Sequence, residues 1–193
     1  MINRELYMEQ ITPFIDKPFV KVITGIRRCG KSVVLRLIRE ELLRRGVSED
    51  YIIYMNFESF EWIDMKEAKA LYAHIQETTK TSGKYYILLD EIQEVTDWEK
   101  AVNAFLVDLD VDIYVTGSNS RLLSSEFSTY LAGRYVAFHI MTLSFKEYLL
   151  FHNLSLTISA SDRKAEFLKY LRMGGFPAIH TANYDYNAIY KIV

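Results

Sequence analysis

Short apolar runs rich in β-branched and aromatic residues alternate along the chain with longer segments in which apolar residues recur at helical spacing. The apolar runs predict β-strands, because such residues favour extended backbone. These predicted strands span residues 19–24, 51–57, 85–89, 112–116 and 134–140. Residues 31–45 and 98–109 show the clearest helical periodicity, with apolar side chains at steps of three and four. Strands that alternate with helices predict an α/β fold, in which helices cover both faces of a mostly parallel, five-stranded sheet.

Weaker patterns complete the predicted organisation. Further helices are expected over residues 4–11, 65–79, 124–131, 144–152, 163–173 and 183–193. Residues 153–162 turn polar, so we expect a core over residues 1–152 and a smaller helical region over residues 153–193. The last helical pattern reaches Val193 without a capping residue, which favours a fragment of a longer protein over a frayed native terminus.

The composition favours a soluble protein of a reducing compartment. The chain has 193 residues, 50% of them hydrophobic, and a single cysteine, so a core must form without an internal disulfide. No apolar run approaches the roughly 20 residues of a membrane span, and the first residues lack the form of a signal peptide. We therefore expect a cytoplasmic protein that does not bind membranes. The net charge of -2 argues against nucleic-acid binding by bulk charge.

One segment matches the phosphate-binding pattern G-x-x-x-x-G-K-S/T, known as Walker A: Gly25-Ile26-Arg27-Arg28-Cys29-Gly30-Lys31-Ser32. Gly25 and Gly30 allow backbone angles at which successive N–H groups converge on an anion, and the helix that follows adds its N-terminal dipole. Lys31 supplies a positive charge to the β- and γ-phosphates, and the Ser32 hydroxyl can ligate Mg²⁺. We expect the nucleotide to bind Gly25, Ile26, Arg27, Arg28, Cys29, Gly30, Lys31, Ser32 and Val33.

An acidic pair, Asp90 and Glu91, directly follows the apolar run 85–89, in the manner of a Walker B motif. Asp90 is predicted to hold Mg²⁺ through its water shell, and Glu91 to polarise the water that attacks the γ-phosphate. The alternative is that the acidic pair merely begins a solvated loop. The phosphate loop earlier in the chain favours a catalytic role for the pair instead. Together the two motifs predict Mg²⁺-dependent ATP hydrolysis. ATP is preferred to GTP because the chain has no Asn-Lys-x-Asp segment, the usual guanine reader.

Two further polar positions are candidates for the reaction. In additional-strand P-loop ATPases the fourth strand lies between the phosphate-loop strand and the acidic strand, so its tip would face the γ-phosphate. Asn119, or failing it Ser118, is the predicted sensor there, and a plain turn is the alternative. Arg134 is predicted to stabilise phosphoryl charge across the subunit interface of a homo-oligomer. Pairing of Arg134 with a surface carboxylate explains it equally well.

Seven basic residues and two acidic ones occupy residues 27–45. This segment is a candidate anion patch and leaves DNA binding open as a third hypothesis, although phosphate binding and helix solvation also account for several of its charges. Cys29 lies among these cations, which would lower the pKa of its thiol. We do not expect catalysis by Cys29, because no histidine stands nearby in the sequence.

The order of these motifs resembles the predicted prokaryotic AAA+ family of archaeal-type ATPases. The resemblance spans nearly the whole chain and includes Leu131-Ala132-Gly133-Arg134, Leu143-Ser144-Phe145-Lys146-Glu147-Tyr148 and Gly174-Gly175-Phe176-Pro177. It implies a three-layer AAA+ core followed by the start of a helical lid, with ATP and Mg²⁺ as cofactors. It also implies that Pro177 contacts the adenine, although a helix-breaking turn explains that residue as well.

By this resemblance, hydrolysis would move the lid against the core. The alternative function is a nucleotide-dependent switch or ATP-binding regulatory protein with negligible turnover.

Overall fold

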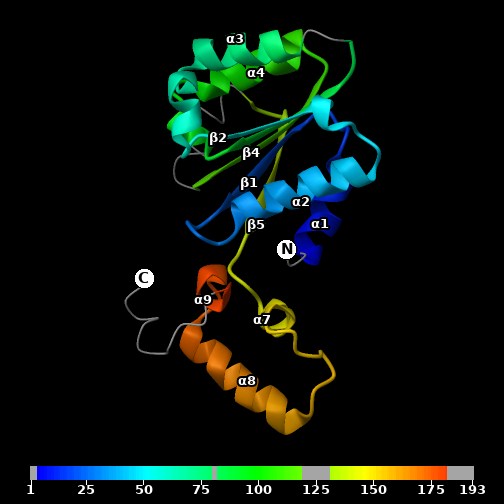
Figure 1. The fold of residues 1–193 in the computed structure, drawn as a ribbon, viewed down its shortest axis with the longest axis vertical. Helices are drawn as coiled ribbons and strands as arrows, with labels where there is room; N and C mark the ends of the chain where they lie inside the picture. Colours follow the sequence, from blue (N-terminus) through cyan, green and yellow to red (C-terminus); the bar gives the residue numbers. More distant parts are fainter. Residues whose placement is uncertain (1–3, 80–81, 119–130, 182–193) are drawn as a thin grey trace.

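The computed structural model describes residues 4–79, 82–118 and 131–181 and contains one five-stranded sheet in the order β2-β3-β4-β1-β5 (Figure 1). All neighbouring strands are parallel. The strands are β1 (Val20–Gly25), β2 (Ile52–Asn56), β3 (Tyr85–Asp90), β4 (Val111–Ser118) and β5 (Tyr135–Ile140). The expected placement of the fourth strand between the phosphate-loop strand and the acidic strand is confirmed. Because the strands are parallel, their carboxyl ends meet at one edge of the sheet.

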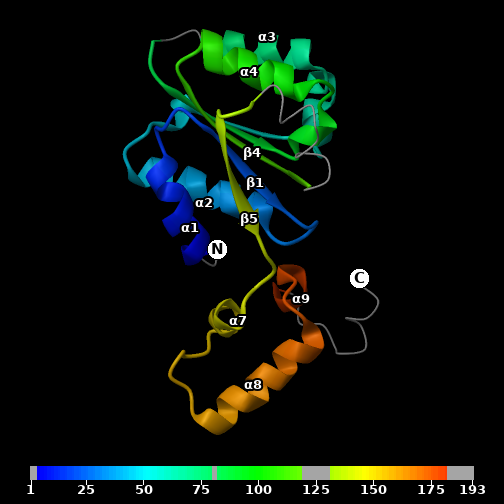
Figure 2. The same cartoon turned by 180° about the vertical axis from the view of Figure 1, so that it is seen from behind.

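Helices cover both faces of the sheet, which confirms the predicted three-layer α/β fold (Figures 1 and 2). One face packs against α1 (Glu5–Ile11) and α2 (Lys31–Arg44), and the other against α3 (Ala68–Thr78) and α4 (Trp98–Asp108). Every residue of β1 and β3 is buried, whereas burial alternates along the edge strand β2. This difference explains the continuous apolar pattern of the third strand in the sequence. Short 3₁₀ helices occupy Thr12–Phe14, Glu49–Tyr51, Phe60–Met65 and Ile92–Glu94.

A smaller lobe follows β5 and contains α7 (Phe145–Phe151), α8 (Ala160–Met173) and α9 (Pro177–Thr181) (Figure 1). Aromatic side chains join its helices: the Phe145 ring lies 5.1 Å from that of Phe167, and the Tyr148 hydroxyl donates to Glu166 at 2.8 Å. The boundary that we predict at residue 152 therefore falls between two helices that contact each other. We call α7, α8 and α9 together the lid lobe.

Several predicted helix boundaries differ from the observed ones. The helix expected over residues 65–79 is observed as α3, which begins only at Ala68, because Glu67 has extended backbone (φ -122°, ψ 138°). Met65 instead ends the preceding 3₁₀ helix. Helix α8 begins at Ala160 rather than at residue 163, because the Ser159 side chain caps it by accepting from the Asp162 N–H. The helices expected over 124–131 and 183–193 lie outside the described residues, apart from residue 131. No helix in the described part of the chain is long and apolar enough to cross a membrane.

Candidate functional site

The predicted phosphate loop connects β1 to α2 at the carboxyl edge of the sheet. Gly25 and Gly30 have positive φ angles of 153° and 104°, and Arg28 adopts the left-handed region at 66°. A Cβ atom on Gly25 would lie 2.4 Å from the Ile140 carbonyl oxygen of β5, so a side chain cannot be accommodated there. Lys31 is the first residue of the 14-residue α2, and the unpaired N–H groups at this helix end favour an anion.

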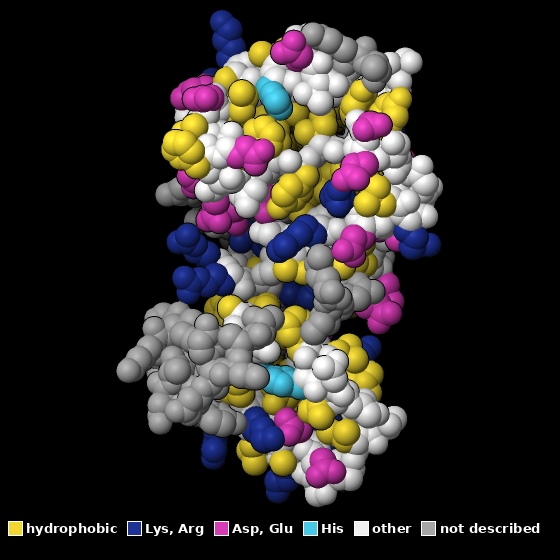
Figure 3. Space-filling model, viewed as in Figure 1, with side chains coloured by type: hydrophobic (Ala, Val, Ile, Leu, Met, Phe, Trp, Pro, Cys, Tyr) yellow, Lys and Arg dark blue, Asp and Glu magenta, His cyan; other side chains and the backbone are white. Residues whose placement is uncertain are grey.

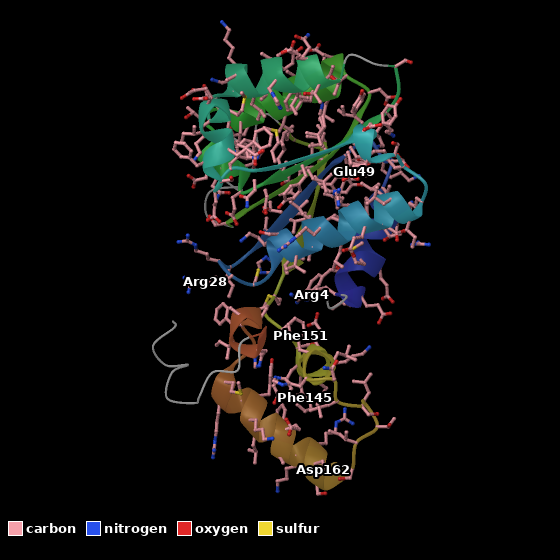
Figure 4. The ribbon with its side chains drawn as sticks, in the orientation of Figure 1. Arg4, Arg28, Glu49, Phe145, Phe151 and Asp162 are labelled. Atoms are coloured by element: carbon pink, nitrogen blue, oxygen red, sulfur yellow. The ribbon has the colours of Figure 1, made fainter. Side chains whose placement is uncertain are left out.

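An open cavity of about 420 Å³ adjoins the loop. Its lining comes from four separate parts of the chain: Arg27, Arg28, Gly30, Lys31, Ser32, Val33, Glu58, Glu91, Pro177 and Ala178. Basic side chains gather on this face between the two lobes, and Arg28 extends from the loop (Figures 3 and 4). Of the other predicted residues, Ile26 is exposed and Asp90 is fully buried behind the cavity wall. Tertiary structure thus brings the phosphate loop, the acidic pair and Pro177 to one site.

Lys31 and Glu91 both line the cavity and form an ion pair. The Lys31 Nζ atom lies 3.3 Å from Glu91 Oε1, and the two side chains are only 3% and 15% exposed. Glu91 has left-handed backbone (φ 55°), and its second carboxylate oxygen accepts from Gln93 Nε2 at 2.6 Å. Low exposure strengthens this charge pair relative to one in water. The pair joins the two motifs that were recognised separately in the sequence.

Asp90 is held by hydroxyl groups from both neighbouring strands. Its Oδ2 accepts from the Tyr54 hydroxyl of β2 at 3.0 Å, and its Oδ1 from the Thr116 hydroxyl of β4 at 2.5 Å. The Thr116 oxygen also accepts from the Glu91 N–H at 2.9 Å, so Thr116 orients both acidic residues. Burial and the nearby Asp90 charge raise the pKa of the Tyr54 hydroxyl, which therefore stays protonated as a donor. Neither Tyr54 nor Thr116 was predicted from the sequence, because their contacts depend on which strands are neighbours.

The donor atoms at the site suit Mg²⁺. The Ser32 hydroxyl and the carboxylates of Asp90 and Glu91 are oxygen donors, which Mg²⁺ prefers, and Mg²⁺ usually takes its remaining ligands from phosphates and water. Within the described ranges, no group of three or more His, Cys, Asp or Glu side chains could hold a metal by itself. The residues present therefore fit a cation that arrives together with a polyphosphate.

The three remaining candidates, Asn119, Ser118 and Arg134, do not line the cavity or lie outside the described residues. Asn119 lies outside the described residues, and Ser118 is half-buried at the end of β4, paired in register with Gly25. Arg134 precedes β5 at the amino edge of the sheet, where its Nη1 donates to Asn103 Oδ1 of α4 at 3.0 Å. At about 3.3 Å per residue, the length of β5 puts Arg134 roughly 20 Å from the phosphate loop of its own chain. Among the described residues, this amide is the partner that the structure shows for Arg134, and the carboxylate alternative stays a prediction.

The prediction of a lowered Cys29 pKa was wrong. Cys29 is fully buried, and burial raises the pKa of its thiol despite the opposing charges of Lys31 and Arg4. The cationic sequence neighbours were the visible signal, but the loss of water around the thiolate outweighs them.

Part of the predicted basic patch is paired with carboxylates. Arg39 bonds to Glu49, and Arg44 and Arg45 both donate to Glu41 at 2.8 Å. These pairs also hold the pKa of Glu41 at about 2. The cations at the start of the segment line the cavity, where Arg27 lies 3.5 Å from Glu58 and Lys31 lies 3.3 Å from Glu91.

Comparison with known proteins identifies the family. A family model described as an AAA domain matches residues 17–149. The chain belongs to this AAA family. The match covers β1 through most of α7, and it confirms the family resemblance carried by the motifs.

Relatives and solved structures agree with this assignment. The chain is 45% identical over 184 residues to a protein of Haemophilus influenzae and 37% identical over 186 residues to a protein of Methanocaldococcus jannaschii. These alignments cover 95% and 93% of the chain but only 46% and 39% of the relatives, so the chain spans less than half of either.

The fold is similar to that of AMPPCP-bound DnaA from Aquifex aeolicus (TM-score 0.59, 16% identity, 94% of this chain and 60% of that chain). It is also similar to the Aeropyrum pernix Orc1 protein in complex with DNA (TM-score 0.53, 16% identity, 86% and 50%). At these identities the likeness concerns the AAA+ fold.

The hydroxyl contacts of Asp90 generate a stability prediction. Thr116→Val preserves the side-chain shape but leaves Asp90 Oδ1 and the Glu91 N–H without their partner. We expect the free energy of unfolding to fall by about 1–3 kcal/mol, measured by urea denaturation. Thr116→Ser keeps the hydroxyl and serves as the matched control. A Val variant as stable as the Ser variant would contradict the assigned role of the hydroxyl.

The buried thiol generates a second prediction. Cys29 is the single cysteine of the chain, so alkylation by iodoacetamide reports on it alone. Near neutral pH the folded protein should react at least about tenfold more slowly than the urea-unfolded chain, because burial raises the thiol pKa and blocks access. The rate should rise as the pH passes above the ordinary thiol range. Equal rates in the folded and unfolded states would show that the thiol is exposed.

Proposed function

We propose that this chain is an AAA+ ATPase module that binds ATP with Mg²⁺, hydrolyses it and couples the nucleotide state to the lid lobe. The observation that supports this function most strongly is the meeting of Lys31 and Glu91 at 3.3 Å beside one cavity. A phosphate-binding lysine and a carboxylate that can activate water are thereby available to the same ligand. The family membership supports the same class of activity.

Binding of the polyphosphate depends on the loop and on α2. The N–H groups of the loop and of the α2 N-terminus donate to phosphate oxygens, and Lys31 adds a point charge. Ser32 and Asp90 are the residues that would hold Mg²⁺, Ser32 through its hydroxyl and Asp90 through a water molecule. The bound cation would neutralise charge on the phosphates during transfer. Because phosphates compete for Lys31, binding weakens its contact with Glu91 and releases that carboxylate.

The released Glu91 then acts as the general base. It accepts a proton from a water molecule whose oxygen bonds to the γ-phosphorus, while the bond from that phosphorus to the bridging oxygen breaks and ADP keeps the electron pair. The Thr116 hydroxyl, which accepts from the Glu91 N–H, keeps the backbone of Glu91 in place during this step. Asn119 remains the predicted sensor of the γ-phosphate.

The lid lobe contributes the opposite wall of the site. Pro177 and Ala178, at the start of α9, line the same cavity as the phosphate loop. A Cβ atom on Gly30 would lie 3.9 Å from Pro177 Cγ, so the lid approaches the loop closely. A nucleotide that binds there touches both lobes, with Pro177 toward the base. Hydrolysis of that nucleotide removes the γ-phosphate and thereby changes the contacts between the ligand and the lid lobe.

One observation favours a second function, a nucleotide-dependent switch with negligible turnover. Both oxygens of Glu91 already have partners, Lys31 and Gln93. The carboxylate must leave these partners before it can accept a proton from water. If that release is rare, bound ATP persists and the protein reports nucleotide state without consuming it.

Glu91→Gln tests the enzyme against the switch. The amide preserves size but cannot act as a base, so ATP turnover at saturation should fall by about 100-fold or more. ATP affinity should be kept or increased, because the phosphates no longer compete with a carboxylate for Lys31. Glu94→Gln is the matched control, because Glu94 lies in the same turn but faces Lys66 at 3.8 Å. Turnover that survives Glu91→Gln would refute the assigned base. A wild-type protein that binds ATP but never hydrolyses it would establish the switch.

Arg134 generates a further prediction, which concerns assembly. Since Arg134 is remote from its own phosphate loop, we propose that it completes the site of a neighbouring copy in a homo-oligomer. Activity per chain should then rise with protein concentration, and Arg134→Ala should lower it by about 1,000-fold. Asn103→Ala removes the partner that Arg134 has among the described residues and should stay active. Activity strictly proportional to concentration, with Arg134→Ala unchanged, would refute this role.

A further inference from the structure

Arg4 is a buried charged residue that the proposed reaction does not use. It directly precedes α1, is 2% exposed and lies between the sheet and the lid lobe (Figure 4). Its Nη1 donates to the Cys29 carbonyl at 3.0 Å, and its Nη2 to the Met141 carbonyl at 2.9 Å. Its Nε donates to Glu147 Oε1 at 2.6 Å. One guanidinium group therefore contacts the phosphate loop, the end of β5 and the lid helix α7.

Met141 begins the connection that leads from β5 to α7. Its carbonyl accepts from Arg4, and its N–H donates to the Tyr7 hydroxyl of α1 at 3.0 Å. The Arg4 guanidinium carbon also lies 4.7 Å from the centroid of the Tyr7 ring. Both main-chain polar groups of Met141 are thus bound from the α1 side. This fixes the point at which the chain leaves the core.

Glu147 serves Arg4 and the start of α7 at the same time. Its Oε2 accepts from the Ser144 N–H at 2.8 Å and completes a capping box, while its Oε1 pairs with Arg4. A cavity of about 170 Å³ lies between α1 and α7. The ion pair, rather than close apolar packing, therefore joins the two helices there. Glu147 therefore orients the first turn of α7 while its carboxylate is bound to Arg4 of the core.

Arg4 also contacts the phosphate loop, through the carbonyl group of Cys29. Because a trans peptide points its C=O and its following N–H in opposite directions, the Cys29 carbonyl bonded to Arg4 leaves the Gly30 N–H on the far side from Arg4. A Cβ atom on Gly30 would also lie 3.3 Å from Arg4 Nη1. A movement of the peptide between Cys29 and Gly30 would therefore change the contacts of the Arg4 guanidinium group.

We propose that Arg4 is a positioning residue that couples the phosphate loop to the lid helix α7 through Glu147. A shift of the Cys29–Gly30 peptide changes the direction of the guanidinium, which carries Met141 and Glu147 with it. The use of this coupling to report a bound nucleotide rests on the proposed function. The coupling between loop and lid is a property of the protein without ligand.

Glu147→Gln is the decisive variant. The amide oxygen can still accept from Ser144 and cap α7, but the charge opposite Arg4 is lost. Glu166→Gln is the matched control, because Glu166 is also a lid carboxylate of low exposure and its partners are Tyr148 and Lys169. Arg4→Lys keeps the charge but cannot reach three partners with one ammonium group, so it should behave like Glu147→Gln.

The first measurement is amide hydrogen exchange over residues 26–34 without nucleotide. Glu147→Gln should accelerate exchange in this loop by about tenfold, the effect expected from losing one charge-assisted hydrogen bond, although the substitution lies in the lid. Glu166→Gln should leave the loop unchanged. Wild-type exchange in Glu147→Gln would overturn the proposal, and so would equal acceleration in Glu166→Gln, which would indicate general destabilisation.

The second measurement adds a non-hydrolysable ATP analogue with Mg²⁺. Its binding should slow exchange in α7 of the wild type and of Glu166→Gln, and this response should be lost in Glu147→Gln. A full α7 response in Glu147→Gln would overturn the nucleotide coupling. Failure of the analogue to bind the wild type would instead refute the proposed function, and the loop measurement alone would then decide whether Arg4 couples the loop to the lid.

Discussion

Burial of the Asp90 carboxylate at the end of an apolar strand places a strict demand on the rest of the sheet. A charged group without exposure must receive hydrogen bonds, and here the donors come from Tyr54 on β2 and Thr116 on β4. Both strands must therefore flank β3. Since β4 also pairs with β1, the phosphate loop lies two strands away from the acidic pair, about 10 Å at the usual strand spacing. The side chains of Lys31 and Glu91 together span that interval and meet at 3.3 Å.

The same arrangement links ligand binding to chemistry in the proposed mechanism. Lys31 and Glu91 neutralise each other at low exposure, and a polyphosphate is a stronger partner for the lysine than one carboxylate is. Arrival of the substrate therefore frees the base only when there is something to hydrolyse. The switch hypothesis uses the same contacts and differs only in how often the carboxylate is released. The two functions are thus separated by a rate rather than by a different site.

The two lobes meet at the phosphate loop in two ways. Pro177 approaches Gly30 from the lid, and Arg4 approaches the same glycine from the core side while it binds Glu147 of α7. A small loop is thus bordered by groups that belong to both lobes. Such a junction suits a module whose lid responds to the nucleotide. It also gives the buried Arg4 a positioning role in the proposed coupling.

Much of this protein could be predicted from local sequence. The phosphate loop depends on glycines and a helix start within eight consecutive residues, and the acidic pair on its place after an apolar strand, so neither requires distant contacts. Tyr54, Thr116 and Arg4 were missed because each acts on a residue at least 25 positions away, and strand order and lobe packing select those partners. Arg134 was recognised as an arginine of interest, but only the direction of β5 places it at the far edge of the sheet. The Cys29 thiol was misjudged because its charged neighbours are visible in the sequence, whereas its burial is not. Sequence alone determined the chemical groups of the site and its family. Tertiary structure decided which of them meet, because burial and contact are set by neighbours in space rather than along the chain.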